Sequence, residues 1–299
     1  MKRSIAGLLA IFLLSAPLFA GPAEFKPDDT ADIGKFAKKT LELKLKKLKK
    51  LGIKKLVIME CYGEYVTSKE VTSSASSQRY TGRITTKTDK LEFSKDYYTN
   101  TSDLVYEEVK AAFEANGIAI VPKEELQANE KYGAFNLEEE KSGRGVSAGM
   151  FKPTVVEKSQ KVSASNLGIF PSNPLKMIKV LMNTCDITHS VGADGLLQVK
   201  FKVGKGKKDR PVLEGFDIML NAEIKEQEVG FKGNKSMRYD FLTQNEQLVK
   251  LKTQLISSDD VYDGKKGPFS GEKYDKALKD ILYAVTDGIK DKIKEALEK

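Results

Sequence analysis

The stretch KLVIMEC, residues 55–61, decides the fold. Its run of consecutive apolar residues shows no alternation, which is typical of a strand buried on both faces. A helix is predicted over residues 103–116, with Asp103 as its cap and Gly117 as its stop, because glycine readily adopts the left-handed conformation. A second apolar run, IAIV at residues 118–121, predicts another buried strand. Strand, crossover helix and strand indicate a parallel pair, and hence an α/β fold.

The rest of the chain extends this sheet. Apolar periodicity predicts further elements: a helix at 175–189, strands at 196–203, 216–224 and 248–256, and a closing helix at 272–297. We therefore predict an α/β fold with α+β character, in which helices pack on a mixed β-sheet. Residues 53–299 are expected to form a single α/β domain, long enough to bury a proper core.

Two long polar segments interrupt this domain. Residues 63–100 are rich in Ser, Thr and Tyr and predict edge strands around residues 83–86 and 91–93. Residues 130–173 contain scattered glycines and prolines and predict an irregular loop. Because binding loops are often carried by a rigid scaffold, both insertions are candidate contact regions.

A tether and a basic helix are predicted over residues 24–52. Ten lysines and one acid lie between residues 35 and 55, where apolar residues recur at near-helical spacing. Such a helix could lie on an anionic membrane or on a partner, with Lys46, Lys47, Lys49 and Lys50 as its contacts. Alternatively, it packs on its own domain with the lysine heads in water, and this interpretation is favoured.

Residues 1–23 have the order of a secretory signal peptide: a positive start, an apolar run and small residues for cleavage after Ala20 or Ala23. We therefore expect an exported chain, periplasmic or secreted. With no cysteine near the cleavage site, the chain is expected to be soluble and not lipid-anchored. Removal of Lys2 and Arg3 with the signal would lower the net charge from +8 to +6, a modest excess that suits anionic surfaces, whereas nucleic acid is a poor partner for an exported protein.

Catalytic motifs are weak. Residues 145–149 fit the Gly-x-Ser-x-Gly pattern of a nucleophile elbow, with Ser147 as nucleophile and His189 as its base. The charged residues before the motif and Pro153 after it do not provide the strand and helix that an elbow needs. A hydrolase using Ser147 and His189, or a carboxylate pair, is therefore the alternative prediction rather than the first one.

Metal and cofactor sites are not predicted. The single histidine excludes sites that need two, and no phosphate-binding glycine motif is present. Asp259, Asp260 and Asp263 hint at calcium but lack the spacing of a known loop. Cys61 and Cys185 are either bridged, as an oxidising compartment allows, or buried as two thiols.

The order of segments resembles the periplasmic domain of the curli-secretion lipoprotein family and the N-terminal domain of the Tol-Pal translocation protein. The shared features are the strand at 56–61, the helix at 103–116, the phrase IAIVP at 118–122, and the Gly-Ala-Asp turn at 192–194 before a strand. The chain departs from the curli-secretion family in having no lipobox cysteine. The resemblance implies an envelope-assembly or binding module and supplies no catalytic residues.

We therefore predict a non-catalytic binding or assembly module of the cell envelope. Its partner would be an envelope protein or a polymer. The alternatives are a secreted hydrolase and a peripheral membrane-surface protein.

Overall fold

The computed structural model describes residues 22–299 except 78–79, 134–139, 150–151, 172–173, 230–236, 265–266 and 299. The predicted signal peptide therefore lies outside the described residues, apart from its last two. Within the described ranges, no helix is both long and apolar enough to cross a bilayer.

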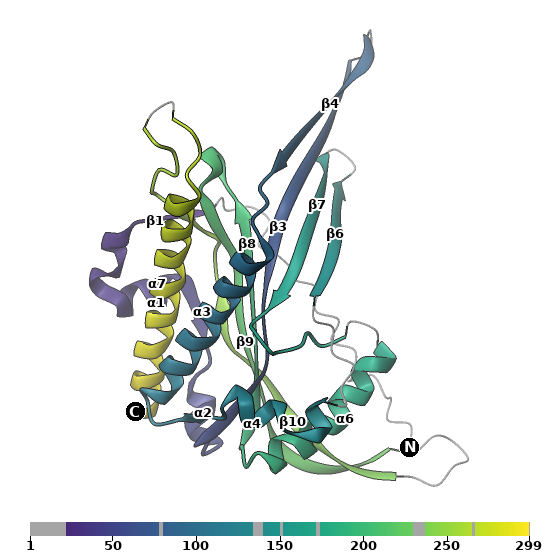
Figure 1. Cartoon of the computed structure of the whole chain (residues 1–299), viewed down its shortest axis with the longest axis vertical. Coiled ribbons are helices and arrows are strands. Elements are labelled where there is room, and N and C mark those ends of the chain that lie inside the picture. Colours follow the sequence, from purple (N-terminus) through teal and green to yellow (C-terminus); the bar gives the residue numbers. More distant parts are fainter. Residues whose placement is uncertain are drawn as a thin grey trace.

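The described residues form seven α-helices and one mixed sheet of eleven strands (Figure 1). The helices are α1 (Ile33–Thr40), α2 (Lys46–Lys50), α3 (Lys95–Glu114), α4 (Lys123–Gln127), α5 (Glu130–Gly133), α6 (Pro174–Ser190) and α7 (Gly271–Glu298). The strands are β1 (Ala23–Phe25), β2 (Leu41–Leu43), β3 (Lys55–Ser77), β4 (Tyr80–Lys90), β5 (Ala119–Ile120), β6 (Glu140–Gly149), β7 (Lys152–Ser163), β8 (Gly195–Lys205), β9 (Pro211–Val229), β10 (Met237–Leu251) and β11 (Leu255–Ser257). The predicted α/β class with a mixed sheet is confirmed.

The sheet is ordered β1-β11-β9-β8-β3-β7-β6, with β4 and β5 beside β3, β10 beside β9, and β2 beside β10. β3 pairs in parallel with both β5 and β8, so the predicted parallel crossover through α3 is confirmed. β3, β7 and β9 are much longer than a buried core requires, and each extends into a hairpin.

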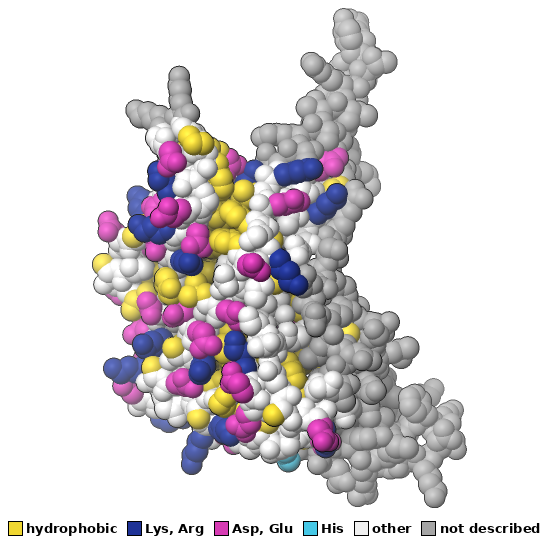
Figure 2. Space-filling model, viewed as in Figure 1, with side chains coloured by type: hydrophobic (Ala, Val, Ile, Leu, Met, Phe, Trp, Pro, Cys, Tyr) yellow, Lys and Arg dark blue, Asp and Glu magenta, His cyan; other side chains and the backbone are white. Residues whose placement is uncertain are grey.

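The helices α3 and α7 lie side by side across one face of the sheet (Figure 1). The predicted apolar face of α3 is buried, with Val105, Val109 and Phe113 each 0 % exposed. Figure 2 shows this side of the molecule, where hydrophobic side chains form a seam between the two helices. At one end of the seam, the rings of Phe93 and Tyr274 lie 5.0 Å apart.

α3 begins earlier than predicted. Ser94 is its N-cap, with its hydroxyl accepting a hydrogen bond from the backbone N–H of Tyr97. Asp103, predicted as the cap, lies inside the helix and accepts a hydrogen bond of 2.8 Å from the backbone N–H of Ser165. Its carboxylate also pairs with Lys123 at 3.2 Å. Asp103 therefore joins α3 to the chain after β7 and to α4.

The predicted tether instead contributes a strand to the sheet, and the predicted single basic helix is instead two helices with a strand between them. Phe25 is 2 % exposed, and its strand β1 pairs with β11. The predicted single helix is divided into α1 and α2 by β2, in which Leu41–Leu43 pairs with β10. Leu41 and Leu43 lie two positions apart, which is the spacing of residues on one face of a strand. Apolar residues that suit a helix therefore also suit this short strand.

Candidate functional site

The two predicted insertions form one β-structure, which we call the blade. Residues 68–77 of β3 pair with β4, and residues 62–72 of β3 pair with β7 on the other side. β7 in turn pairs with β6, which gives the local order β4-β3-β7-β6. The edge strand predicted around residues 83–86 is confirmed as part of β4, whereas the irregular loop expected over 130–173 is wrong. The predicted strand at 91–93 is also wrong, because the chain there is irregular before α3.

The blade extends the sheet away from its helical cover. Figure 1 shows the β3–β4 hairpin projecting beyond the helices, with β6 and β7 beside it. β4 and β6 form the two edges, and among the described strands neither has a partner on its outer side. Edge strands present unpaired backbone N–H and C=O groups, which can accept another strand.

A charged network lies where the blade joins the main sheet. The Glu157 carboxylate accepts hydrogen bonds from Lys69 at 2.9 Å and Lys202 at 3.1 Å. Lys202 also pairs with Glu214 at 3.1 Å. Although burial opposes ionisation, the two ammonium groups lower the pKa of Glu157 below its ordinary value. Burial likewise disfavours the charged form of Lys202, but Glu214 and Glu157 raise its pKa above the usual range.

The network belongs to a polar face of the sheet. In β3, Cys61 and Tyr65 point toward α3, where the hydroxyl oxygens of Tyr65 and Ser102 lie 3.0 Å apart. Because side chains alternate along a strand, Glu60, Tyr62 and Glu64 point to the opposite side. The parallel register places Gln198, Lys200 and Lys202 of β8 directly beside these three residues.

Glu60 is the centre of this polar face, and its carboxylate is 1 % exposed. One carboxylate oxygen accepts a 2.7 Å hydrogen bond from the backbone N–H of Phe170. The other accepts from Gln198 at 3.0 Å and pairs with Lys200 at 3.1 Å. Three donors offset the cost of burying the charge, so Glu60 holds β3, β8 and the chain before α6 together.

Tyr62 lies between cations on the same face. The ammonium groups of Lys161 and Lys200 lie 5.3 Å and 5.6 Å from its ring centroid, within the range of cation–π attraction. Burial, together with the carboxylates of Glu60 and Glu64, raises the pKa of Tyr62 well above its ordinary value. The phenol therefore stays neutral and does not act as a base.

The predicted hydrolase pair does not form an elbow. Ser147 lies within strand β6, opposite Val155 of β7, and not at a turn from a strand into a helix. His189 is exposed in the last turn of α6. The helix ends one residue later, and Ile187 and Thr188 of the same turn are buried while His189 faces outward. The Gly-x-Ser-x-Gly match therefore lies in a strand and lacks the backbone geometry of an elbow.

The predicted calcium ligands are not arranged as a site. Asp263 pairs with Lys273 at 2.9 Å, and Asp260 accepts a hydrogen bond from the backbone N–H of Tyr262. In the part of the chain that the structure describes, no group of three His, Cys, Asp or Glu residues could hold a metal ion. Cys61 and Cys185 are both buried as thiols, so the alternative of a bridge is not realised.

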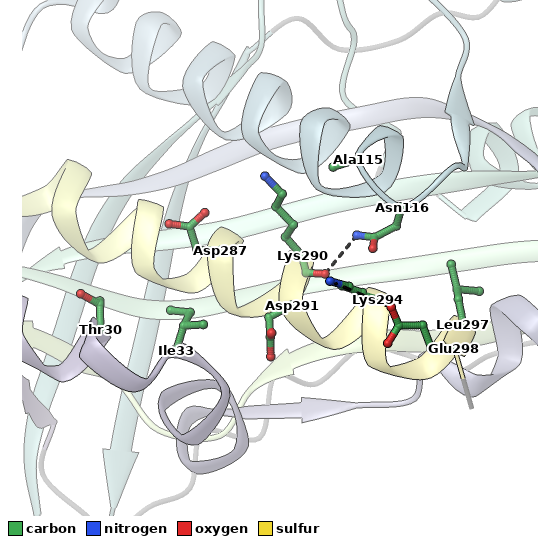
Figure 3. A pocket seen from close by; sticks show the side chains of 10 residues that line it. All are labelled: Thr30, Ile33, Ala115, Asn116, Asp287, Lys290, Asp291, Lys294, Leu297 and Glu298. Carbon is green, nitrogen blue, oxygen red and sulfur yellow. Dashed lines mark hydrogen bonds and ion pairs between the residues drawn. The ribbon is translucent and has the colours of Figure 1, made fainter.

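A surface groove of about 840 Å³ lies between α7, the end of α3 and the start of α1 (Figure 3). Asn116 crosses it, donating a hydrogen bond of 3.0 Å to the backbone oxygen of Lys290. Acidic and basic side chains alternate along α7 here, and Lys294 lies 4.0 Å from Glu298. Because these charges compensate each other, the groove favours neither anionic nor cationic ligands.

Comparisons of the chain with protein-family models, curated proteins and solved structures found no match. The resemblance to the curli-secretion and Tol-Pal proteins therefore stays a prediction.

Proposed function

We propose that the protein is a non-catalytic binding or assembly module of the cell envelope, and that the blade makes its contacts. One observation carries the proposal: two segments far apart in sequence, 63–100 and 130–173, pair through β3 and β7 into one projecting sheet. A partner protein or polymer of the envelope would meet the blade along β4 or β6, or across its faces.

The junction between the blade and the main sheet supports this role. The network of Lys69, Glu157, Lys202 and Glu214 ties β3, β7, β8 and β9 together where the blade begins. Fixed charges at this position hold the blade in one orientation relative to the core. A rigid contact element loses less conformational entropy on binding than a mobile loop does.

Shortened hairpins test the proposal. The first variant removes residues 73–85 and joins Thr72 to Thr86, which face each other in the β3–β4 register, through an Asn-Gly turn. The second removes residues 147–155 and joins Val146 to Val156 in the same way. Both changes retain Glu157 and the core of the sheet.

The matched control shortens the β9–β10 hairpin by removing residues 226–240 and joining Lys225 to Phe241, which are also register partners. Each tagged chain is cross-linked in intact cells and recovered from the envelope fraction. We expect discrete adducts for the full chain and the control, and their loss from at least one of the blade variants. Adducts that survive both blade deletions, or disappear only in the control, would refute the proposal.

A further inference from the structure

A cluster of lysines surrounds helix α2 at one end of the molecule. We call Lys44, Lys46, Lys49, Lys50 and Lys54 the α2 patch; all five are exposed. The apolar side of the same segment faces inward, since Leu45 and Leu48 are 3 % and 0 % exposed. The inward packing of the leucines directs the lysines on the short helix outward.

Among the described residues, the α2 patch has one carboxylate against its backbone, since Asp194 accepts a 2.7 Å hydrogen bond from the N–H of Lys54, but its ammonium groups have no acidic partner. In the described parts of the chain, none of its five ammonium groups has a carboxylate within ion-pair distance, whereas the neighbouring Lys47 pairs with Glu246 at 2.7 Å. Lysines on α7 differ: Lys273, Lys279 and Lys294 each have an acidic partner. The patch is therefore a local concentration of uncompensated positive charge, which attracts anions over a distance set by the salt.

The shape of the patch favours an extended anionic surface. The charges lie on an outward-facing helix and its two flanks, and none of these lysines lines the groove of Figure 3. A small anion would need a hollow to enclose it, and an anionic chain would need a track along several elements. A five-residue helix flanked by lysines can instead bring several ammonium groups to one plane.

We propose that the α2 patch is a docking surface for an anionic lipid bilayer, held by electrostatic attraction alone. The buried leucines exclude the insertion of an amphipathic helix into the headgroup layer, which the sequence left open. The contact is independent of the blade, which remains available for a partner.

Vesicle binding tests this proposal. The purified full chain is sedimented with vesicles that contain phosphatidylglycerol and, separately, with vesicles of phosphatidylcholine only. Each lysine near an anionic surface strengthens partition by roughly fivefold, so the triple variant K46A/K49A/K50A should bind about 100-fold more weakly. Binding of the full chain should also fall steeply with added salt.

A second triple variant, K273A/K279A/K294A, removes the same charge from paired lysines and is the matched control. It should retain most of the binding, and both variants should show the circular dichroism spectrum of the unchanged chain. Equal losses in the two variants would overturn the proposal, because net charge alone would then explain the binding. Retention on heparin without binding to the anionic vesicles would also overturn it, as would displacement by inorganic phosphate at matched ionic strength.

Discussion

Replacement of Glu60 by alanine should be the most destabilising single change on the polar face. The substitution removes the acceptor for the backbone N–H of Phe170, for Gln198 and for Lys200. Phe170 is 5 % exposed, so its N–H would remain buried without that acceptor, at a cost of about 2 kcal/mol. Gln198 is half-buried and can turn partly toward water, which reduces its share to about 1 kcal/mol.

Lys200 adds little to this sum because its side chain is 35 % exposed and can be solvated. The space left by the missing side-chain atoms adds about 1 kcal/mol. The free energy of unfolding should therefore fall by about 4 kcal/mol, within the range for breaking a buried ion pair. Glu60→Gln keeps the volume and one acceptor oxygen and should cost about 2 kcal/mol.

Urea unfolding, followed by far-ultraviolet circular dichroism because the chain has no tryptophan, measures these changes. Lys161→Met is the matched control, since it removes a lysine of the same face that contacts the Tyr62 ring rather than Glu60; it should cost less than about 1 kcal/mol. The reasoning fails if Glu60→Ala stays within about 1 kcal/mol of the unchanged chain, or if Lys161→Met costs as much.

Three further measurements follow from the same structure. Glu157→Gln should reduce the loss of stability in acid. In the folded chain, Lys202 and Lys69 outweigh burial and lower the pKa of Glu157 below the ordinary 4.5. The stabilisation that the ionised carboxylate provides is therefore complete above pH 4.5 and is lost as the pH falls through the folded pKa. Urea unfolding at neutral and acid pH should then show a flatter profile for the variant, and an unchanged profile would contradict the assignment. Ser147→Ala should not alter turnover of activated ester probes, because β6 does not present an elbow; any esterase activity lost in this variant would restore the hydrolase. Cys61 and Cys185 should resist maleimide in the folded chain, because burial shields both thiols and raises the pKa of Cys61, and both should react in denaturant without a reductant. Mass spectrometry would show no labels after denaturation if the two were bridged.

The parts of the fold that were predicted correctly have a local signal. The strand at 55–61, the helix that ends before Gly117 and the closing helix α7 each combine apolar periodicity with a clear stop or start. Gly117 has a φ of +79°, as its predicted role at the end of a helix requires. Burial on a defined face leaves a pattern in the sequence, and these elements have one.

The blade has no such pattern. Its strands extend beyond the helical layer, so a sequence rich in Ser, Thr and Lys is compatible with both a polar loop and an uncovered hairpin. β2 was missed for a different reason: its pairing with β10 joins residues more than two hundred positions apart, and only that contact distinguishes Leu41–Leu43 from a helical turn. Tertiary pairing overrode the local preference.

The polar face could have been found from the sequence. Glu60 lies near the end of the predicted strand 55–61 and Glu64 four positions later, while Gln198, Lys200 and Lys202 alternate with apolar residues in the predicted strand 196–203. Once the two strands are taken as parallel neighbours, their acids and bases fall opposite each other, as Glu64 and Lys202 do. The register was the missing information, because a shift of one residue would place these side chains in the core.

The pairing of β1 with β11, and of β2 with β10, sets the order in which the chain can fold. The first described strands find their partners only near the far end of the sequence, and α1 packs against the terminal helix α7. A chain that emerges from a ribosome or a translocation channel from its N-terminus cannot complete the sheet until almost all of it has passed. The early strands therefore lack their final neighbours during most of synthesis. The chain stays open enough to pass through a channel, and closure of the sheet is a late step.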